Sequence, residues 1–134
     1  MITLDTSALY AAMNRSERYH KEIRAALLAD IGPYLVPAGI LAEIAYLVET
    51  TLNLGVLDAF LSDLETGGYT LDCGEGDVQR IRVLVRRYAD LPLEFADASV
   101  IACAERSGGR VLTLDRRHFG VVAREGRLNL LPTL

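Results

Sequence analysis

The sequence of 134 residues has few cysteines, a single lysine and no long apolar run. Two cysteines, Cys73 and Cys103, are too few for a disulfide framework, and reduced thiols are typical of cytoplasmic proteins. Apolar runs that are short and interrupted by charges exclude a membrane-spanning helix. The first residues lack the basic start, apolar stretch and cleavage site of a secretory signal. We therefore expect a cytoplasmic protein without membrane association.

Positive charge is also scarce. The net charge is −4, with 14 Lys and Arg against 18 Asp and Glu residues. This balance argues against a nucleic-acid binder that depends on general basic attraction. All the basic residues except Lys21 are arginines, whose planar guanidinium group suits two-point contacts with phosphate. Arginine-rich usage can also reflect genome composition, so charge alone decides little.

The length predicts one domain spanning residues 1–134. Apolar residues at helical spacing, and short apolar runs bounded by Gly, Pro and Asn, predict the elements. The predicted strands are residues 2–4, 34–36, 69–71, 110–114 and 128–131. The predicted helices are residues 6–13, 17–29, 38–52, 56–64, 77–88 and 95–106, with residues 53–55 stopping the third. Because strands alternate with helices, we expect an α/β fold with a short, mainly parallel sheet sandwiched by helices.

Two acids, Asp5 and Asp115, directly follow predicted strands. The carboxyl ends of parallel strands line the ligand crevice of an open sheet, so both acids are expected on one rim. The alternative is that each one merely caps the helix or turn that follows it.

Two further acids, Glu43 and Asp97, lie within predicted helices. Each has apolar residues three and four positions further along, which predicts that both face the core, where an unpaired charge is costly (Tyr46, Leu47, Val100 and Ile101). Glu43 could instead pair with an arginine or lie at an edge, and Asp97 could cap its helix.

A cluster of four carboxylates repels itself unless cations neutralise it. Oxygen ligands without His or Cys nearby favour Mg²⁺ or Mn²⁺, which can activate water for phosphodiester cleavage. Asp5, Glu43, Asp97 and Asp115 are therefore the candidate catalytic and metal-binding residues. Neighbouring hydroxyl groups are expected to orient these acids or metal-bound water, although capping and strand packing explain each of them equally well (Thr6, Ser7, Ser99 and Thr113).

Four ordered segments resemble the PIN-domain family, and specifically its VapC-type toxins. They are Ile2-Thr3-Leu4-Asp5-Thr6-Ser7-Ala8-Leu9, Ile40-Leu41-Ala42-Glu43, Phe95-Ala96-Asp97-Ala98-Ser99-Val100-Ile101-Ala102 and Leu112-Thr113-Leu114-Asp115-Arg116-Arg117-His118-Phe119. The resemblance covers nearly the whole chain and implies a PIN fold with Mg²⁺- or Mn²⁺-dependent cleavage of RNA. It implies that the same four acids bind metal and that Thr6 or Ser7 is the family's hydroxyl position. It also implies a homodimer and a small VapB-type antitoxin that contacts the N-terminal helices and directs a basic residue toward the acids.

Arginines near the predicted site are candidates for holding RNA phosphates. We assign this role to Arg82, Arg86 and Arg116, whereas Arg80 and Arg87 fit a solvated helix face. Glu94 could join the acids but is expected at the rim, as a helix-start charge. His118 is expected to cap or pack the segment around Phe119 rather than to act as a base.

Three other protein classes fit less well. A haloacid dehalogenase-type phosphatase needs a second acid two residues after Asp5, where this chain has Ser7, and a downstream lysine, whereas Lys21 is too early. A receiver domain needs adjacent acids and a late lysine. The alternative kept open is a catalytically inactive PIN-like module that binds RNA or a partner, although such a module would be expected to have lost one of the acids.

Overall fold

The computed structural model describes residues 1–133 and shows a sheet of five parallel strands. The strands are β1 (Ile2–Leu4), β2 (Tyr34–Pro37), β3 (Thr70–Asp72), β4 (Arg110–Leu112) and β5 (Asn129–Leu131). Their order in the sheet is β3-β2-β1-β4-β5, so the first strand of the chain is the central one. The predicted α/β class is confirmed, and every strand pair in the described residues is parallel.

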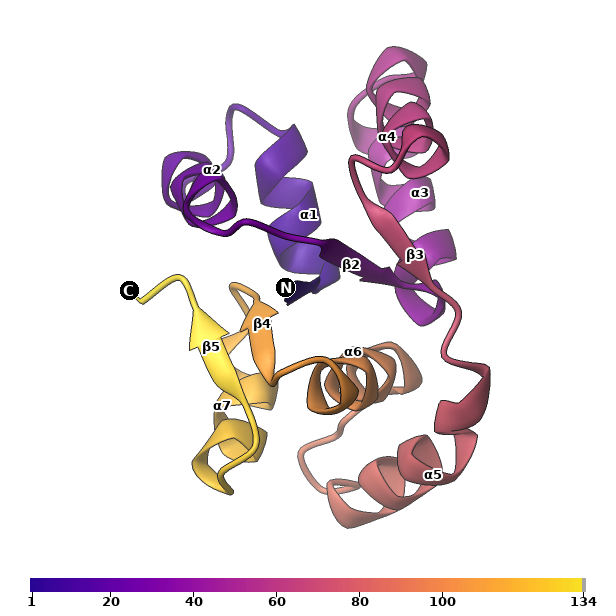
Figure 1. Ribbon diagram of the computed structural model, residues 1–134, viewed down its shortest axis with the longest axis vertical. Coiled ribbons are helices and arrows are strands. Elements are labelled where there is room, and N and C mark those ends of the chain that lie inside the picture. The colour runs from indigo at the N-terminus through magenta and orange to yellow at the C-terminus, as the bar shows by residue number, and fades with distance from the viewer. Residues whose placement is uncertain (134) are drawn as a thin grey trace.

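Helices cover both faces of the sheet (Figure 1). Those on one face are α1 (Thr6–Met13), α2 (His20–Ala29), α3 (Ala38–Thr51) and α4 (Leu54–Thr66). Those on the other are α5 (Val78–Arg87), which follows the short 3₁₀ turn η1 (Glu75–Asp77), then α6 (Phe95–Arg106) and α7 (Arg116–Arg124). This division follows from right-handed crossovers that run outward from β1 in opposite directions.

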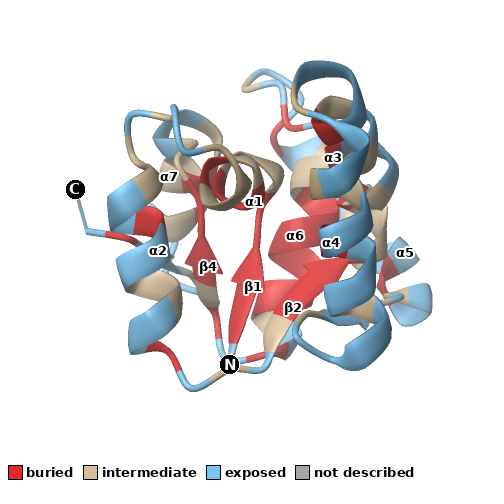
Figure 2. Cartoon of the chain, turned by 90° about the horizontal axis from the view of Figure 1, so that it is seen from above, coloured by how far each residue is buried: buried red, intermediate tan, exposed pale blue. Residues whose placement is uncertain are grey.

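The core lies between β1 and the helices next to it, as the red elements of Figure 2 show. Strand β1 is completely buried, and α6 is buried continuously from Ala98 to Ala104. Helix α6 contacts β1, β2 and β4, which places it under the centre of the sheet. Burying apolar side chains of this kind contributes about 1.5–3 kcal/mol each.

Three local predictions were wrong. Helix α3 ends before residue 53 as predicted, but the next helix begins at Leu54 rather than at Val56, because the Asn53 side chain accepts a hydrogen bond from the Val56 amide and caps α4. Strand β4 ends at Leu112 rather than at Leu114. Helix α7 was not predicted, because its buried residues are only Phe119 and Val122, too few to establish a period.

The structure has both cysteines as free thiols, Cys73 exposed and Cys103 buried. Across residues 1–133, none of the helices is both long and apolar enough to cross a bilayer.

Candidate active site

The four predicted acids line one pocket at the carboxyl edge of the sheet. The pocket has a volume of about 420 Å³, and its lining residues are Asp5, Thr6, Ser7, Glu43, Tyr46, Leu47, Asp97 and Asp115. Leu4 of β1 is in register with Leu112 of β4, and the Asp5 amide donates to the Leu112 carbonyl at 3.1 Å. Neighbouring parallel strands therefore bring Asp5 and Asp115 to the same rim, as predicted.

Asp5 is the buried acid of the pocket, with 6% of its surface exposed. Its Oδ2 atom accepts hydrogen bonds from Ser7 Oγ and Thr113 Oγ1, each at 2.8 Å. Burial raises the pKa of Asp5, the two hydroxyl donors oppose this in part, and the nearby charge of Asp115 raises it further. A buried carboxylate of this kind is costly unless donors or cations compensate it.

Ser7 and Thr113 connect this carboxylate to the loop that carries the fourth acid. The Leu114 amide donates to Ser7 Oγ at 3.0 Å, and the Asp115 amide donates to Thr113 Oγ1 at 2.9 Å. The same two hydroxyl groups therefore hold Asp5 and position the backbone that leads to Asp115.

Asp97 lies in the first turn of α6 and is half-buried, so it faces the core only in part. It forms a capping box with Glu94, and its Oδ2 atom accepts from the Glu94 amide at 3.2 Å. Desolvation, together with the charges of Asp5 and Asp115, raises the pKa of Asp97 to about 6 despite that hydrogen bond. The capping alternative therefore holds, and Asp97 reaches the pocket as well.

Glu43 is exposed, which contradicts the prediction that it faces the core. The buried face of α3 consists of Ile40, Ile44 and Val48, at a spacing of four residues. Glu43 lies beside that face, where Thr6 Oγ1 donates to its Oε1 atom at 2.5 Å. A hydroxyl group at the start of α1 thus orients the carboxylate of α3 at the pocket.

Asp115 caps α7, and its second oxygen contacts His118, which we expected to cap or pack the segment around Phe119. Its Oδ1 atom accepts from the His118 amide at 3.0 Å, and its Oδ2 atom lies 2.9 Å from His118 Nδ1. The sequence signal was the Asp-x-x-His spacing at a helix start, which places the two side chains on one turn. The expectation that no histidine lies near the four acids was therefore wrong, although His118 does not line the pocket itself.

The comparisons with known proteins identify the family. Residues 2–125 match the PIN domain family. The chain is 32% identical over 133 residues to ribonuclease VapC26 of Mycobacterium tuberculosis, and the alignment covers 96% of this chain and 98% of the relative. The chain belongs to the PIN-domain family, in its VapC-type branch.

Two solved structures share this PIN fold. VapC20 of Mycobacterium tuberculosis, described as a sarcin–ricin loop cleaving toxin, superposes with a TM-score of 0.81 at 15% identity, covering 98% of this chain and all of the other. FitAcB of Neisseria gonorrhoeae superposes with a TM-score of 0.66 at 22% identity, covering 98% and 97% of the two chains. At these identities the likeness concerns the fold.

The donor chemistry of the PIN-domain pocket suits a hard divalent cation. Its four carboxylates supply only oxygen, which Mg²⁺ and Mn²⁺ prefer. The charge of Asp115 raises the pKa of Asp5, and the charges of Asp5 and Asp115 raise the pKa of Asp97, so a bound cation would make both carboxyl groups easier to ionise. Within residues 1–133 no three His, Cys, Asp or Glu side chains already lie together as they would around a bound metal ion.

Glu94 and the predicted RNA-binding arginines lie outside the PIN-domain pocket. Glu94 is the capping residue of α6, in agreement with its expected helix-start position. Arg82 and Arg86 are exposed on α5. The Arg116 guanidinium donates to the Pro132 carbonyl, and none of the three arginines lines the pocket.

The two arginines assigned to a solvated helix face form ion pairs. Arg80 pairs with Glu105 at 2.8 Å, and Arg87 pairs with Glu125 at 2.7 Å. These contacts fasten α5 to α6 and to the end of α7, which is a structural role.

Proposed function

We propose that this PIN domain is a metal-dependent endoribonuclease, the toxin of a VapBC-type toxin–antitoxin pair. The observation that carries the proposal is the single pocket in which Asp5, Glu43, Asp97 and Asp115 meet. Kinship over nearly the full length with ribonuclease VapC26 supports RNA as the substrate. A catalytically inactive module would be expected to lack one of these acids, and this chain has all four.

The four acids are proposed to act together. Asp5, Asp97, Asp115 and Glu43 line one pocket and are the ligands proposed to hold Mg²⁺ or Mn²⁺. When bound, the ion lowers the pKa of a coordinated water and stabilises charge on the phosphate. Ser7 and Thr113 fix the orientation of Asp5, and Thr6 fixes that of Glu43. Because these carboxylates are already oriented, less free energy is needed to reorganise them during the reaction.

The proposed partners follow from the VapC kinship. We expect a homodimer, a small VapB-type antitoxin bound near α1 and α2, and a cytoplasmic location. The antitoxin would inhibit by directing a basic side chain into the acidic pocket, where opposite charges attract strongly. The proposed RNA contacts of Arg82, Arg86 and Arg116 complete the description, with Arg116 limited by its bond to Pro132.

Cleavage of labelled total RNA tests the proposal, with Mg²⁺, with Mn²⁺ and with EDTA. Asp97→Asn should reduce the cleavage rate by at least about 100-fold, because it removes a charged ligand worth several kcal/mol of transition-state stabilisation. Asp90→Asn removes an exposed acid outside the pocket and is the matched control, which should cleave like the wild type. Equal cleavage by wild type and Asp97→Asn, or cleavage that persists in EDTA, would contradict the mechanism. RNA binding without cleavage by the wild type would favour the inactive module.

A further inference from the structure

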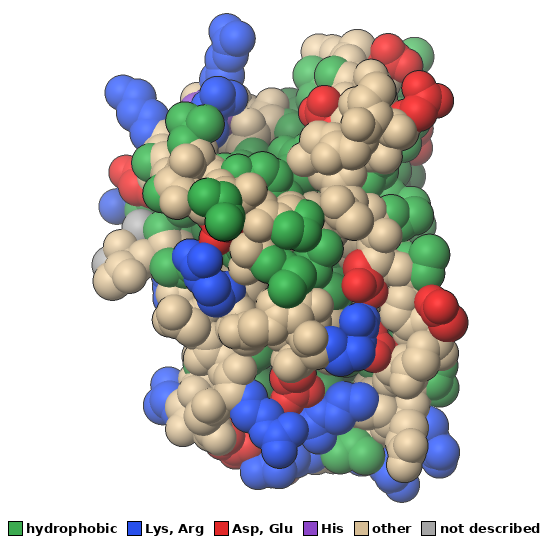
Figure 3. All heavy atoms as spheres, in the orientation of Figure 1, with side chains coloured by type: hydrophobic (Ala, Val, Ile, Leu, Met, Phe, Trp, Pro, Cys, Tyr) green, Lys and Arg blue, Asp and Glu red, His purple; other side chains and the backbone are tan. Residues whose placement is uncertain are grey.

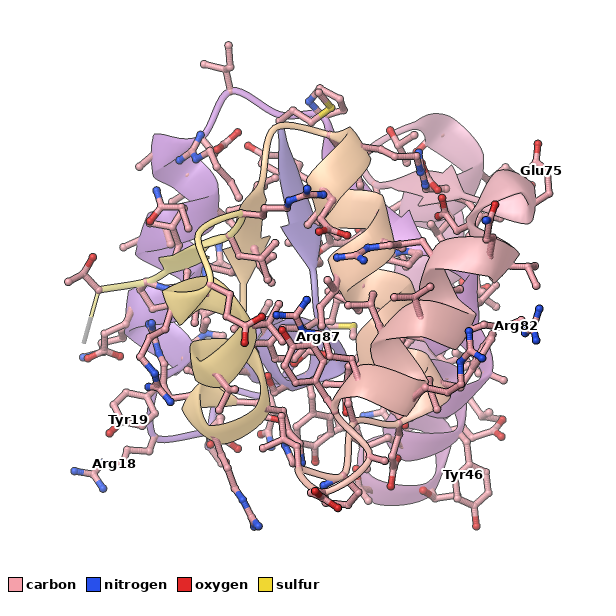
Figure 4. The ribbon with its side chains drawn as sticks, turned by 90° about the horizontal axis from the view of Figure 1, so that it is seen from below. Arg18, Tyr19, Tyr46, Glu75, Arg82 and Arg87 are labelled. Atoms are coloured by element: carbon pink, nitrogen blue, oxygen red, sulfur yellow. The ribbon has the colours of Figure 1, made fainter. Side chains whose placement is uncertain are left out.

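Tyr46 is a large aromatic side chain that the packing of the protein does not use. It is 67% exposed on α3, and in Figure 4 it extends away from the ribbon into solvent. Among residues 1–133 its hydroxyl group makes no hydrogen bond, whereas the hydroxyl groups of Tyr10, Tyr34 and Tyr88 all do. Single exposed apolar side chains are common on protein surfaces, so the argument for Tyr46 depends on where its ring lies.

The position of Tyr46 ties it to the acidic pocket. It follows Glu43 by three residues on α3, so both side chains lie on one side of the helix. Tyr46 and Leu47 line the same pocket as the four acids. The pocket therefore has three acids on the side of β1, β4 and α6, while α3 contributes Glu43 together with the ring of Tyr46 and the side chain of Leu47.

Charge alone does not hold a nucleic acid in this pocket. No lysine, arginine or histidine is among its lining residues, and four of those residues are acids that repel phosphate. Even with one divalent cation bound, the lining keeps a net negative charge. Affinity for RNA inside the pocket beyond the contact of the phosphate with the cation must then come from contacts without charge, and the large apolar surface in the lining is that of Tyr46 and Leu47.

We propose that Tyr46, supported by Leu47, is a platform on which one unpaired base of the RNA stacks, next to the phosphodiester held at the acids. This inference rests on the proposed ribonuclease function and deepens it. Aromatic rings bind bases of any identity because every base has a flat π-face, and this is how single-stranded RNA is commonly recognised. The pocket volume of about 420 Å³ lies within the range of small-ligand sites.

The proposal defines the substrate class as unpaired RNA. A base inside an A-form helix is already stacked on both faces and is not free to lie on Tyr46. A loop, bulge or single strand offers such a base at little cost. The protein should therefore cleave a loop or single strand and spare the same sequence in a perfect duplex.

The experiment measures RNA binding and cleavage separately. Binding of a single-stranded oligonucleotide carrying fluorescent 2-aminopurine is measured in the Asp97→Asn background, where cleavage is suppressed. Adding Tyr46→Ala should weaken binding about 5- to 150-fold, the range expected for the loss of one base–aromatic stack of ~1–3 kcal/mol. In the otherwise wild-type protein, Tyr46→Ala should raise KM while leaving kcat nearly unchanged, because stacking holds ground and transition states alike.

Two variants serve as controls. Tyr46→Phe keeps the ring and should bind like the parent. Leu28→Ala removes an apolar side chain that is 78% exposed on α2, outside the pocket, and should change nothing. Thermal unfolding of each variant confirms that it is folded.

The outcomes separate this inference from the proposed function. If Tyr46→Ala binds and cleaves RNA like the wild type while Asp97→Asn abolishes cleavage, the stacking platform is wrong and the ribonuclease stands. If Tyr46→Ala changes the oligomeric state, measured by light scattering, without changing RNA affinity, Tyr46 belongs to an interface between copies and the inference is overturned. A wild-type protein that neither binds nor cleaves RNA overturns both.

Discussion

At the scale of single residues, the chemistry of the pocket depends on how firmly each carboxyl group holds its proton. Desolvation and the neighbouring acids Asp5 and Asp115 raise the pKa of Asp97 from an ordinary value of 3.8 to about 6. Burial raises the pKa of Asp5 as well. A divalent cation binds ionised carboxylates, so protons and the cation compete for these residues.

Metal binding should therefore weaken as the pH falls through about 6. Below this pKa, each further pH unit should lower the affinity for Mn²⁺ about tenfold for one linked proton, measured by titration calorimetry between pH 7.5 and pH 5. Asp97→Asn should bind Mn²⁺ more weakly and lose the inflection near pH 6. An affinity that stays constant over this range would contradict the assignment of Asp97 as a ligand.

In the metal-free protein, the pH dependence of folding stability should have the opposite sign to that of metal affinity. Because folding raises the pKa of Asp97, the folded state binds this proton more tightly than the unfolded state. The contribution of Asp97 to stability is complete below pH 3.8 and is lost as the pH rises through about 6. Urea unfolding in EDTA at a series of pH values measures this loss of stability, which tests the same raised pKa of Asp97 without metal.

The identity of the four acids could be predicted from the sequence, but their relative burial could not. Helical spacing predicts which residues share one face of a helix, but it does not predict which neighbouring element packs against that face. Glu43 leaves α3 toward the open edge of the sheet and is exposed, whereas Asp5, ambiguous in the sequence, is enclosed by Ser7 and Thr113. The contact between His118 and Asp115 was also hidden, because α7 itself was not predicted.

At the scale of helices and strands, the pocket depends on the close approach of α3 to α6. Gly39, near the start of α3, faces Ser99 on α6: a Cβ atom added to Gly39 would lie 2.3 Å from Ser99 Oγ and 2.5 Å from its Cβ. Both helices carry an acid of the pocket, Glu43 and Asp97, so this contact sets the distance between two of its walls.

Gly39→Ala should lower the free energy of unfolding by about 1–3 kcal/mol, because overpacking forces two helices apart. Urea unfolding followed by circular dichroism measures this change. Gly76→Ala is the matched control, since a Cβ there meets nothing within 4 Å and the residue has no positive φ. Equal stability of Gly39→Ala and the wild type would show that α3 and α6 separate without cost.

The alternation of elements predicted the parallel sheet, but the strand order was not available from the pattern. The chain first builds β1, β2 and β3 outward in one direction and then returns to add β4 and β5 on the other side of β1. The direction in which strands are added changes between β3 and β4. This change depends on the long-range packing of α6 under the sheet rather than on local spacing in the sequence. That reversal puts β1 beside β4, and so puts Asp5 near Asp115.

At the scale of the whole molecule, charge is unevenly distributed between the two layers of helices. Residues 78–133 contain 10 of the 14 basic residues but only 6 of the 18 acidic ones. They form α5, α6, β4, α7 and β5, and blue side chains gather at the lower end of Figure 3, over α5 and α7. An acidic protein can thus attract RNA with one face, since local potential rather than net charge steers a polyanion.

Arg82 and Arg86 are among the arginines of this face that are available for phosphate. Arg80, Arg87, Arg106, Arg110 and Arg127 are engaged in ion pairs with acidic residues. Within residues 1–133, Arg82 and Arg86 form no ion pair, and both are exposed, one turn apart on α5. Figure 4 shows Arg82 extending into solvent.

Arg82→Ala/Arg86→Ala should weaken RNA binding and make it less dependent on salt. Each phosphate contact on a single strand contributes about 0.7 to the slope of log K against log salt concentration, so losing two contacts should reduce the slope by about 1.4. Fluorescence anisotropy over a series of salt concentrations measures this slope in the Asp97→Asn background. Arg15→Ala/Lys21→Ala changes the net charge equally from exposed positions before and within α2, and should leave the slope almost unchanged. If both double variants lower the slope alike, the RNA is attracted by overall charge and not by α5.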